Sequence, residues 1–167
     1  MRALFSFSLS VVSLFFIASC SSGEAEKVSE VKGEALSPVI MVCEHGAVKS
    51  VMAMELFNKE AKKRGLNVRA ESRGIDLYEA IPPKIATLLE ADGFNAGAFK
   101  PQALSRTDVT MSSRVVAIGT NLSAFQSFTP NQIVQWNDIP PASVDFKVAQ
   151  AAMLVQIREL LDELEKS

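Results

Sequence analysis

Cys43 and Lys49 belong to a stretch, PVIMVCEHGAVKS, whose residue types and spacing fit the binding and attack of an oxyanion. The apolar run at 39–42 predicts a buried strand that ends at Cys43. A loop containing Gly46 follows, and Lys49-Ser50 begins a segment with helical periodicity. Where a strand passes through a tight loop into a helix, main-chain N–H groups converge and the helix dipole adds positive potential. The sequence therefore predicts an oxyanion-binding loop with a cysteine thiolate, the nucleophilic form, at its mouth.

The first twenty residues predict an export signal. Residues 4–17 form an apolar core that is too short for a permanent transmembrane helix. The following Ile17-Ala18-Ser19-Cys20 resembles the lipobox of bacterial lipoproteins, which implies cleavage before Cys20 and acylation of that cysteine. The alternative is a plain signal peptide with an incidental cysteine. By the same resemblance, Ser21 implies sorting to the outer membrane in a host that has one, with the domain exported to the periplasmic side.

Three segments are expected along the chain. Residues 1–19 form the signal peptide, and residues 20–37 contain the lipidated cysteine and a flexible linker. The linker is rich in Ser, Glu, Lys, Gly and Ala, a composition that cannot bury a core. Residues 38–167 form the folded domain, which a lipid on Cys20 would hold at the membrane.

The net charge and the numbers of cysteines and histidines limit the partners and cofactors that we expect. A net charge of −2 gives no reason to expect a nucleic-acid partner. The chain has two cysteines, so a lipid on Cys20 leaves Cys43 without a disulfide partner. Cys43 is then either a buried, inert residue or a reactive one, and its position between strand and loop favours the second reading. The single histidine, His45, offers too few ligands for zinc, and we expect neither a metal nor another cofactor.

Strands and helices are expected to alternate through the rest of the chain. Further strands are predicted at 67–72, 114–118 and 132–136, and helices at 51–64, 82–93, from Ser105 onward, and at about 145–165. This alternation predicts an α/β sandwich on a parallel sheet. Ligands of such folds bind at the carboxyl ends of the strands, so Cys43, Asn121 and Asp138 are expected at one edge.

With this loop and this order of elements, residues 38–167 resemble the low-molecular-weight protein tyrosine phosphatases, whose fold the thioredoxin-coupled arsenate reductases share. The first strand of that family ends in Cys-x5-Arg-Ser, and this chain has Cys43-x5-Lys49-Ser50. Residues 71–74 resemble the family's turn after the second strand, and residues 101–104 resemble the approach to the third. The resemblance implies a three-layer sandwich in which helices flank a four-stranded parallel sheet of order 2-1-3-4.

The resemblance also implies roles for individual residues. The Cys43 thiolate would attack phosphorus and form a phosphocysteine. Ser50 would donate a hydrogen bond to the thiolate, and Lys49 would bind the oxyanion. The family takes its general acid from an Asp-Pro pair after the fourth strand, so Asp138, one residue removed from Pro140, is the candidate and Asp145 the runner-up. The main-chain N–H groups that would bind the phosphate oxygens belong to Glu44, His45, Gly46, Ala47 and Val48.

Two departures from the family pattern leave the function open. Lys49 replaces the family's arginine, so a point charge stands where a guanidinium would grip two oxygens. Val48 replaces a second loop cysteine, which the arsenate-reductase cycle needs. The leading interpretation is a phosphatase that acts on a phosphorylated protein, at phosphotyrosine, or on a small phosphoester. The alternatives are a non-catalytic phosphate or oxyanion binder and a thiol-redox protein related to arsenate reductase. Tyr78 is expected to be an ordinary surface residue.

Overall fold

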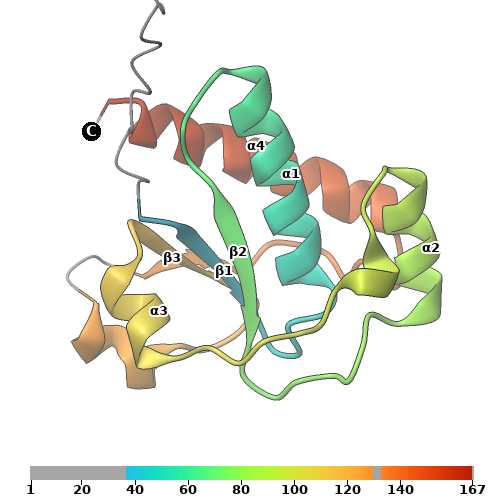
Figure 1. The fold of residues 1–167 in the computed structure, drawn as a ribbon, viewed down its shortest axis with the longest axis horizontal. Helices are drawn as coiled ribbons and strands as arrows, with labels where there is room; N and C mark the ends of the chain where they lie inside the picture. Colours follow the sequence, from blue (N-terminus) through green and yellow to red (C-terminus); the bar gives the residue numbers. More distant parts are fainter. Residues whose placement is uncertain (1–36, 130–132, 167) are drawn as a thin grey trace, which may run out of the picture. The chain divides into compact units, whose positions relative to one another are not determined.

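Four parallel strands form the centre of the folded part of the chain (Figure 1). The structure, a computed structural model, describes residues 37–129 and 133–166. The predicted signal peptide, Cys20 and the linker up to residue 36 therefore lie outside the described residues. The strands β1 (Val39–Cys43), β2 (Ala70–Gly74), β3 (Arg114–Ile118) and β4 (Val134–Trp136) are arranged in the order β2-β1-β3-β4. Every neighbouring pair is parallel, which confirms the predicted sheet.

Helices cover both faces of the sheet and complete the three predicted layers (Figure 1). The α-helices are α1 (Lys49–Lys63), α2 (Pro83–Ala91), α3 (Arg106–Met111) and α4 (Phe146–Leu164), and the 3-10 helices are η1 (Ala96–Ala98) and η2 (Ser123–Phe128). The first core cluster joins α1, α2 and α4 to one face, and the second joins α3 and η2 to the other. In residues 37–129 and 133–166, no helix combines the length and apolarity needed to cross a membrane.

Strand β1 is buried along its whole length because it lies inside the sheet with a helical layer on each side. Successive side chains of a strand point to opposite faces. Val39 and Met41 accordingly belong to the cluster with α1 and α4, whereas Ile40 and Val42 belong to the cluster with α3. This position explains the continuous apolar run that precedes Cys43.

Strand β2 lies further along the chain than predicted. The expected span was 67–72, and the observed strand is Ala70–Gly74. The Asn58 side chain marks its beginning, because Oδ1 accepts from Ala70 N at 2.7 Å and Nδ2 donates to Ala70 O at 3.1 Å. In this register Gly74 pairs with Cys43, so β2 ends beside the candidate site. Helix α1 begins at Lys49, where the sequence predicted that the helical segment opens.

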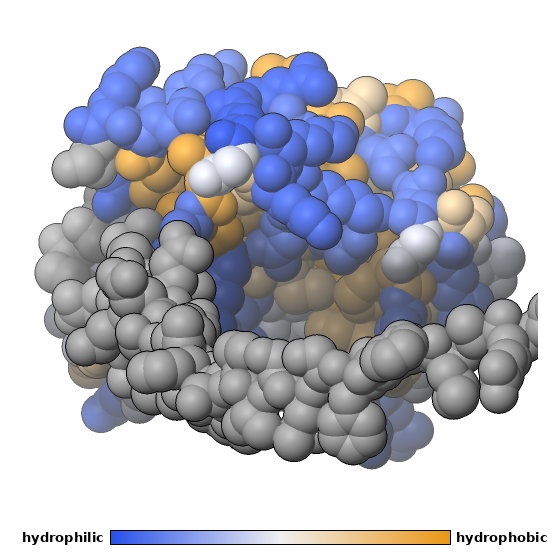
Figure 2. Space-filling model, turned by 45° about the horizontal axis from the view of Figure 1, so that its top comes forward, coloured by the Kyte–Doolittle hydropathy of each residue, from blue (hydrophilic) through white to orange (hydrophobic). Residues whose placement is uncertain are grey.

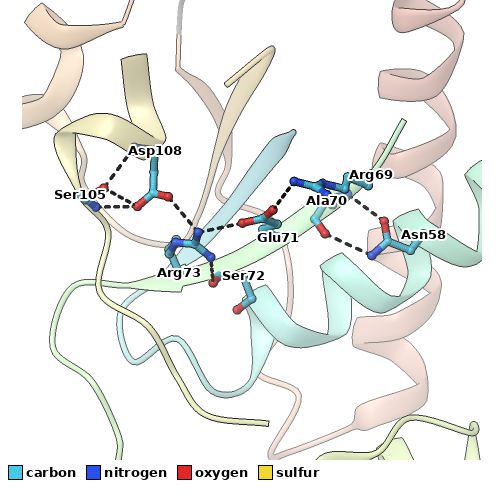
Figure 3. A network of polar contacts seen from close by, with 8 residues as sticks. All are labelled: Asn58, Arg69, Ala70, Glu71, Ser72, Arg73, Ser105 and Asp108. Carbon is cyan, nitrogen blue, oxygen red and sulfur yellow. Dashed lines mark hydrogen bonds and ion pairs between the residues drawn. The ribbon is translucent and has the colours of Figure 1, made fainter. Parts of the chain in front are cut away.

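A polar network ties the edge strand β2 to α3 (Figure 3). The guanidinium of Arg73 donates to Glu71 and to Asp108, each at 2.8 Å. Ser105 and Asp108 form a capping box at the start of α3, the helix expected from Ser105 onward. Burial opposes the charge on Asp108, but the hydrogen bonds from Arg73 and Ser105 outweigh it and hold the pKa of that carboxyl below its ordinary value. In Figure 3, Ser72 points away from this network, toward α1.

Ion pairs connect α1 with α4 on the other face of the sheet. Arg64 Nη1 lies 2.6 Å from Asp162 Oδ1, and Arg158 Nε lies 3.5 Å from Glu60 Oε1.

The face of the molecule shown in Figure 2 is mainly hydrophilic, with smaller hydrophobic areas between the polar ones.

Candidate active site

Cys43 ends β1 beneath a loop that leads into α1, and it is 6% exposed. Its Sγ lies 3.1 Å from Ser50 Oγ. Ser72 Oγ donates to Ser50 Oγ at 2.9 Å, so the proton of Ser50 is left to point at the sulfur. The two hydroxyls thus form a relay from β2 through α1 to Cys43.

The loop between Cys43 and α1 is shaped by its contacts with the segment after β2. The carbonyl of Glu44 accepts from Ile75 N at 2.8 Å and from Asp76 N at 2.9 Å. Gly46 has φ +63°, a conformation that glycine adopts without strain. Gly74 packs so closely that a Cβ there would lie 2.5 Å from Gly46 N. The shape of the loop therefore depends on glycine at both positions.

The N-terminus of helix α1 is suited to binding an anion. Its N-cap residue, Val48, provides no side-chain hydrogen bond to the first turn. The first N–H groups of a helix have no partner within the helix, and the N-terminus carries the positive end of the dipole. The first turn and the preceding loop together provide the donors that a phosphate-sized oxyanion needs.

A cavity of about 360 Å³ opens above Cys43. Its volume is at the lower end of the range for small-molecule sites. The structure brings much of the predicted loop to this cavity, while Gly46, Ala47 and Ser50 are buried. The lining residues are Cys43, Glu44, His45, Val48, Lys49, Tyr78, Pro82, Lys84, Ile85, Ile118, Gly119, Pro141, Ala142 and Ser143.

Lys49 lines the cavity and is hydrogen-bonded to the segment after β4. Its Nζ donates to the carbonyl of Ile139 at 3.0 Å. It also lies close to Gly119 at the end of β3, where an added Cβ would be 3.2 Å from Nζ. The ammonium is thus held between the ends of two strands while it lines the cavity.

Glu44 and His45 occupy fixed positions at the cavity. Glu44 Oε2 accepts from Thr120 Oγ1 at 2.8 Å. His45 Nδ1 lies 2.7 Å from the carbonyl oxygen of Asp76, so Nδ1 carries the proton in this contact. The Tyr78 ring stacks on the imidazole with a centroid distance of 4.1 Å. Tyr78 is exposed at the surface, as expected, and it also forms part of the cavity wall.

The two acid candidates lie elsewhere. Asp138 is exposed, two residues after β4, and does not belong to the lining. Asp145 Oδ1 accepts from Val148 N at 3.0 Å and caps α4. Among the described lining residues, Glu44 is the only one with a carboxylate. Within 37–129 and 133–166, no three His, Cys, Asp or Glu side chains gather in a way that could hold a metal.

Comparison with known proteins assigns the family. Residues 38–130 match the model of the low molecular weight phosphotyrosine protein phosphatase family. The chain belongs to this family. A search of curated proteins finds no match. Membership of this family supports a phosphatase or a related thiol-dependent oxyanion enzyme.

Solved structures share the fold of this family member. YfkJ from Bacillus subtilis is 19% identical with a TM-score of 0.67, and the match covers 78% of this chain and 96% of YfkJ. A low molecular weight phosphotyrosine phosphatase from Vibrio cholerae is 18% identical with a TM-score of 0.61, covering 77% and 97%. An arsenate reductase from Archaeoglobus fulgidus is 25% identical with a TM-score of 0.57, covering 74% and 98%.

Proposed function

We propose that this protein is a cysteine-dependent phosphatase that acts on phosphotyrosine or a small phosphoester. The observation that carries the proposal is the position of Cys43 Sγ, 3.1 Å from the Ser50 hydroxyl and at a cavity beside the start of α1. A thiolate there has an oriented donor beside it, and a phosphoryl group above it would meet the loop N–H groups.

The reaction would proceed in two displacements at phosphorus. The Cys43 thiolate forms a P–S bond while the ester P–O bond breaks, and the departing oxygen takes the electron pair and a proton. Water then attacks the phosphocysteine, releasing inorganic phosphate and restoring the thiolate. Lys49 and the N–H groups of residues 44–49 would stabilise the charge on the three non-bridging oxygens. Asp138 remains our candidate for the proton donor, since catalytic hydrogen bonds often form only in the substrate complex.

Hydrolysis of aryl phosphates tests the proposal. The wild type should hydrolyse 4-nitrophenyl phosphate at least about tenfold faster than Cys43→Ala, which is a minimum criterion, because loss of a catalytic nucleophile can lower kcat by about 10⁶-fold. Equal rates would refute the proposed phosphatase. Asp138→Asn should slow the hydrolysis of phenyl phosphate more than that of 4-nitrophenyl phosphate, because phenolate is the poorer leaving group and depends more on protonation. Asp145→Asn is the matched control, and a selective effect there would move the role of acid to Asp145.

A non-catalytic oxyanion binder is the second candidate, and two observations favour it. Lys49 Nζ is already bound to Ile139 O, and Asp138 does not line the cavity. Calorimetry with inorganic phosphate decides between the candidates, because binding to Cys43→Ala without turnover by the wild type selects the binder. If Lys49 replaces an arginine in catalysis, Lys49→Arg should raise turnover. With a lipid on Cys20, Cys43 would be the one free thiol of the chain, so a thiol-redox cycle would need an external thiol.

We also propose that a lipid on Cys20 tethers the domain to a membrane. The support is the sequence around Cys20, with small residues before it and a polar segment after it. Metabolic labelling with a radioactive fatty acid should mark the wild type and leave Cys20→Ser unlabelled. Equal labelling of the two proteins would refute the tether.

A further inference from the structure

The cavity contains two lysines, and a phosphate above Cys43 accounts for only one of them. Lys49 comes from the first turn of α1, beside the loop, and Lys84 from the first turn of α2. Lys84 Nζ donates to the carbonyl of Ser143 at 3.3 Å. An ammonium has three N–H donors, so each lysine keeps two for a ligand after its contact with a main-chain carbonyl.

These two charges are not neutralised by neighbouring side chains in the described part of the chain. Both lysines contact carbonyl oxygens rather than carboxylates. Glu44, the only described lining residue with a carboxylate, accepts from Thr120 instead. With two ammonium groups and one carboxylate, the lining carries a net positive charge, which attracts anionic ligands.

The walls that accompany the lysines are apolar or aromatic. Tyr78 and His45 contribute a stacked pair of rings at one side. The apolar lining residues are Val48, Pro82, Ile85, Ile118, Pro141 and Ala142. A ligand that fills this cavity should therefore have an apolar or aromatic body with an anionic group for each lysine.

We infer that Lys84 binds a second anionic group, a carboxylate or a phosphate, carried by the leaving group of the substrate. The phosphoryl group to be cleaved then lies at the Cys43 loop beside Lys49. This inference rests on the proposed function for the position of that phosphoryl group. It narrows the substrate class to phosphomonoesters of acidic, largely aromatic or apolar molecules, including a phosphotyrosine with an acidic group nearby.

Calorimetry on the Cys43→Ala protein tests this class without requiring turnover. We expect 3- or 4-carboxyphenyl phosphate to bind about three- to tenfold more tightly than phenyl phosphate, as for one added ion pair in a partly open site. Lys84→Gln should abolish this preference while changing the affinity for phenyl phosphate by less than about twofold. Lys84→Arg should keep the preference. Higher ionic strength should reduce it, because salt screens exposed charges.

Lys166→Gln is the matched control, because it removes the same charge far from the cavity. Helix α4 has 19 residues and is therefore about 28 Å long; it begins near Ser143, and Lys166 follows its other end. It should leave both affinities unchanged. Equal binding of the phosphates by the parent protein, or a preference that survives Lys84→Gln, would overturn the inference. An equal loss for both ligands in Lys84→Gln would overturn it too, because Lys84 would then only support the segment around Ser143. Absence of turnover in the wild type would refute the phosphatase and leave this binding result intact.

Discussion

The close approach of Gly74 to the loop should make Gly74→Ala damaging to both stability and oxyanion binding. A Cβ at this position would lie 2.5 Å from Gly46 N and 2.8 Å from both Gly46 Cα and His45 C. The optimum separation of such atoms is about 3.5–4.0 Å, so the overlap is about 1 Å. All three atoms are main chain, so no flexible side chain can turn aside.

Gly74 itself is held in place and cannot move away from the clash. Its N–H donates to Gln102 O at 2.9 Å, and its carbonyl accepts from Leu104 N at 2.8 Å. It also pairs with Cys43 in the sheet. The loop must therefore shift, which we expect to lower the free energy of unfolding by about 1–3 kcal/mol, as in other overpacked sites. A displacement of about 1 Å in the binding N–H groups should weaken phosphate binding by about tenfold or more.

Urea denaturation and calorimetry with inorganic phosphate measure the two effects of Gly74→Ala separately. Gly97→Ala is the neutral control, because its added Cβ would meet only an atom 3.9 Å away. Gly65→Ala controls for strain, since φ is +70° with nothing within 4 Å. It should cost about 1–2 kcal/mol and leave phosphate binding intact. If Gly74→Ala matches Gly97→Ala in both measurements, the close approach does not shape the loop.

Two further variants test the relay and the polar network. Ser50→Ala should slow alkylation of Cys43 by iodoacetamide about tenfold at neutral pH, because the thiolate loses a donor; an unchanged rate would contradict the relay. Asp108→Asn should destabilise the protein by about 1–2 kcal/mol at neutral pH, since Arg73 loses a charged partner. Because the pKa of Asp108 is lowered on folding, its stabilisation is present above the ordinary value of 3.8 and is lost as the pH falls through the folded value. The difference in urea midpoint between variant and wild type should therefore shrink in acid, and a constant difference would refute this account.

The fold was largely predictable because its two central strands have simple patterns. The runs at 39–42 and 115–118 are apolar, and both lie in strands inside the sheet. Strand β2 was placed too early because it is an edge strand with Glu71 and Arg73 on one face, so hydrophobicity does not mark its limits. Strand β2 begins instead where the Asn58 side chain is hydrogen-bonded to Ala70. These residues are twelve positions apart, so the pattern within the strand does not reveal the contact.

The loop of the site was predictable because its residues are consecutive, whereas the opposite wall was not. Cys43 and Lys49 line the cavity as expected from the strand-loop-helix pattern. Tyr78, Lys84 and Ser143 reach the cavity from two other segments through tertiary packing. No periodicity marks such residues, and the only available signal was their position near the start of a predicted helix, where α/β folds bind ligands.

Lys49 occupies a position that suits an ammonium. Gly119 follows β3 with φ +62°, and its missing side chain leaves room for Nζ, which would otherwise lie 3.2 Å from a Cβ. The carbonyl of Ile139 provides the fixed acceptor on the other side at 3.0 Å. One of three donors is thereby used, and two remain for an oxyanion at the loop. Because the charge is held by main-chain atoms at the ends of β3 and β4, a phosphate would meet it in place, without first having to order a long side chain.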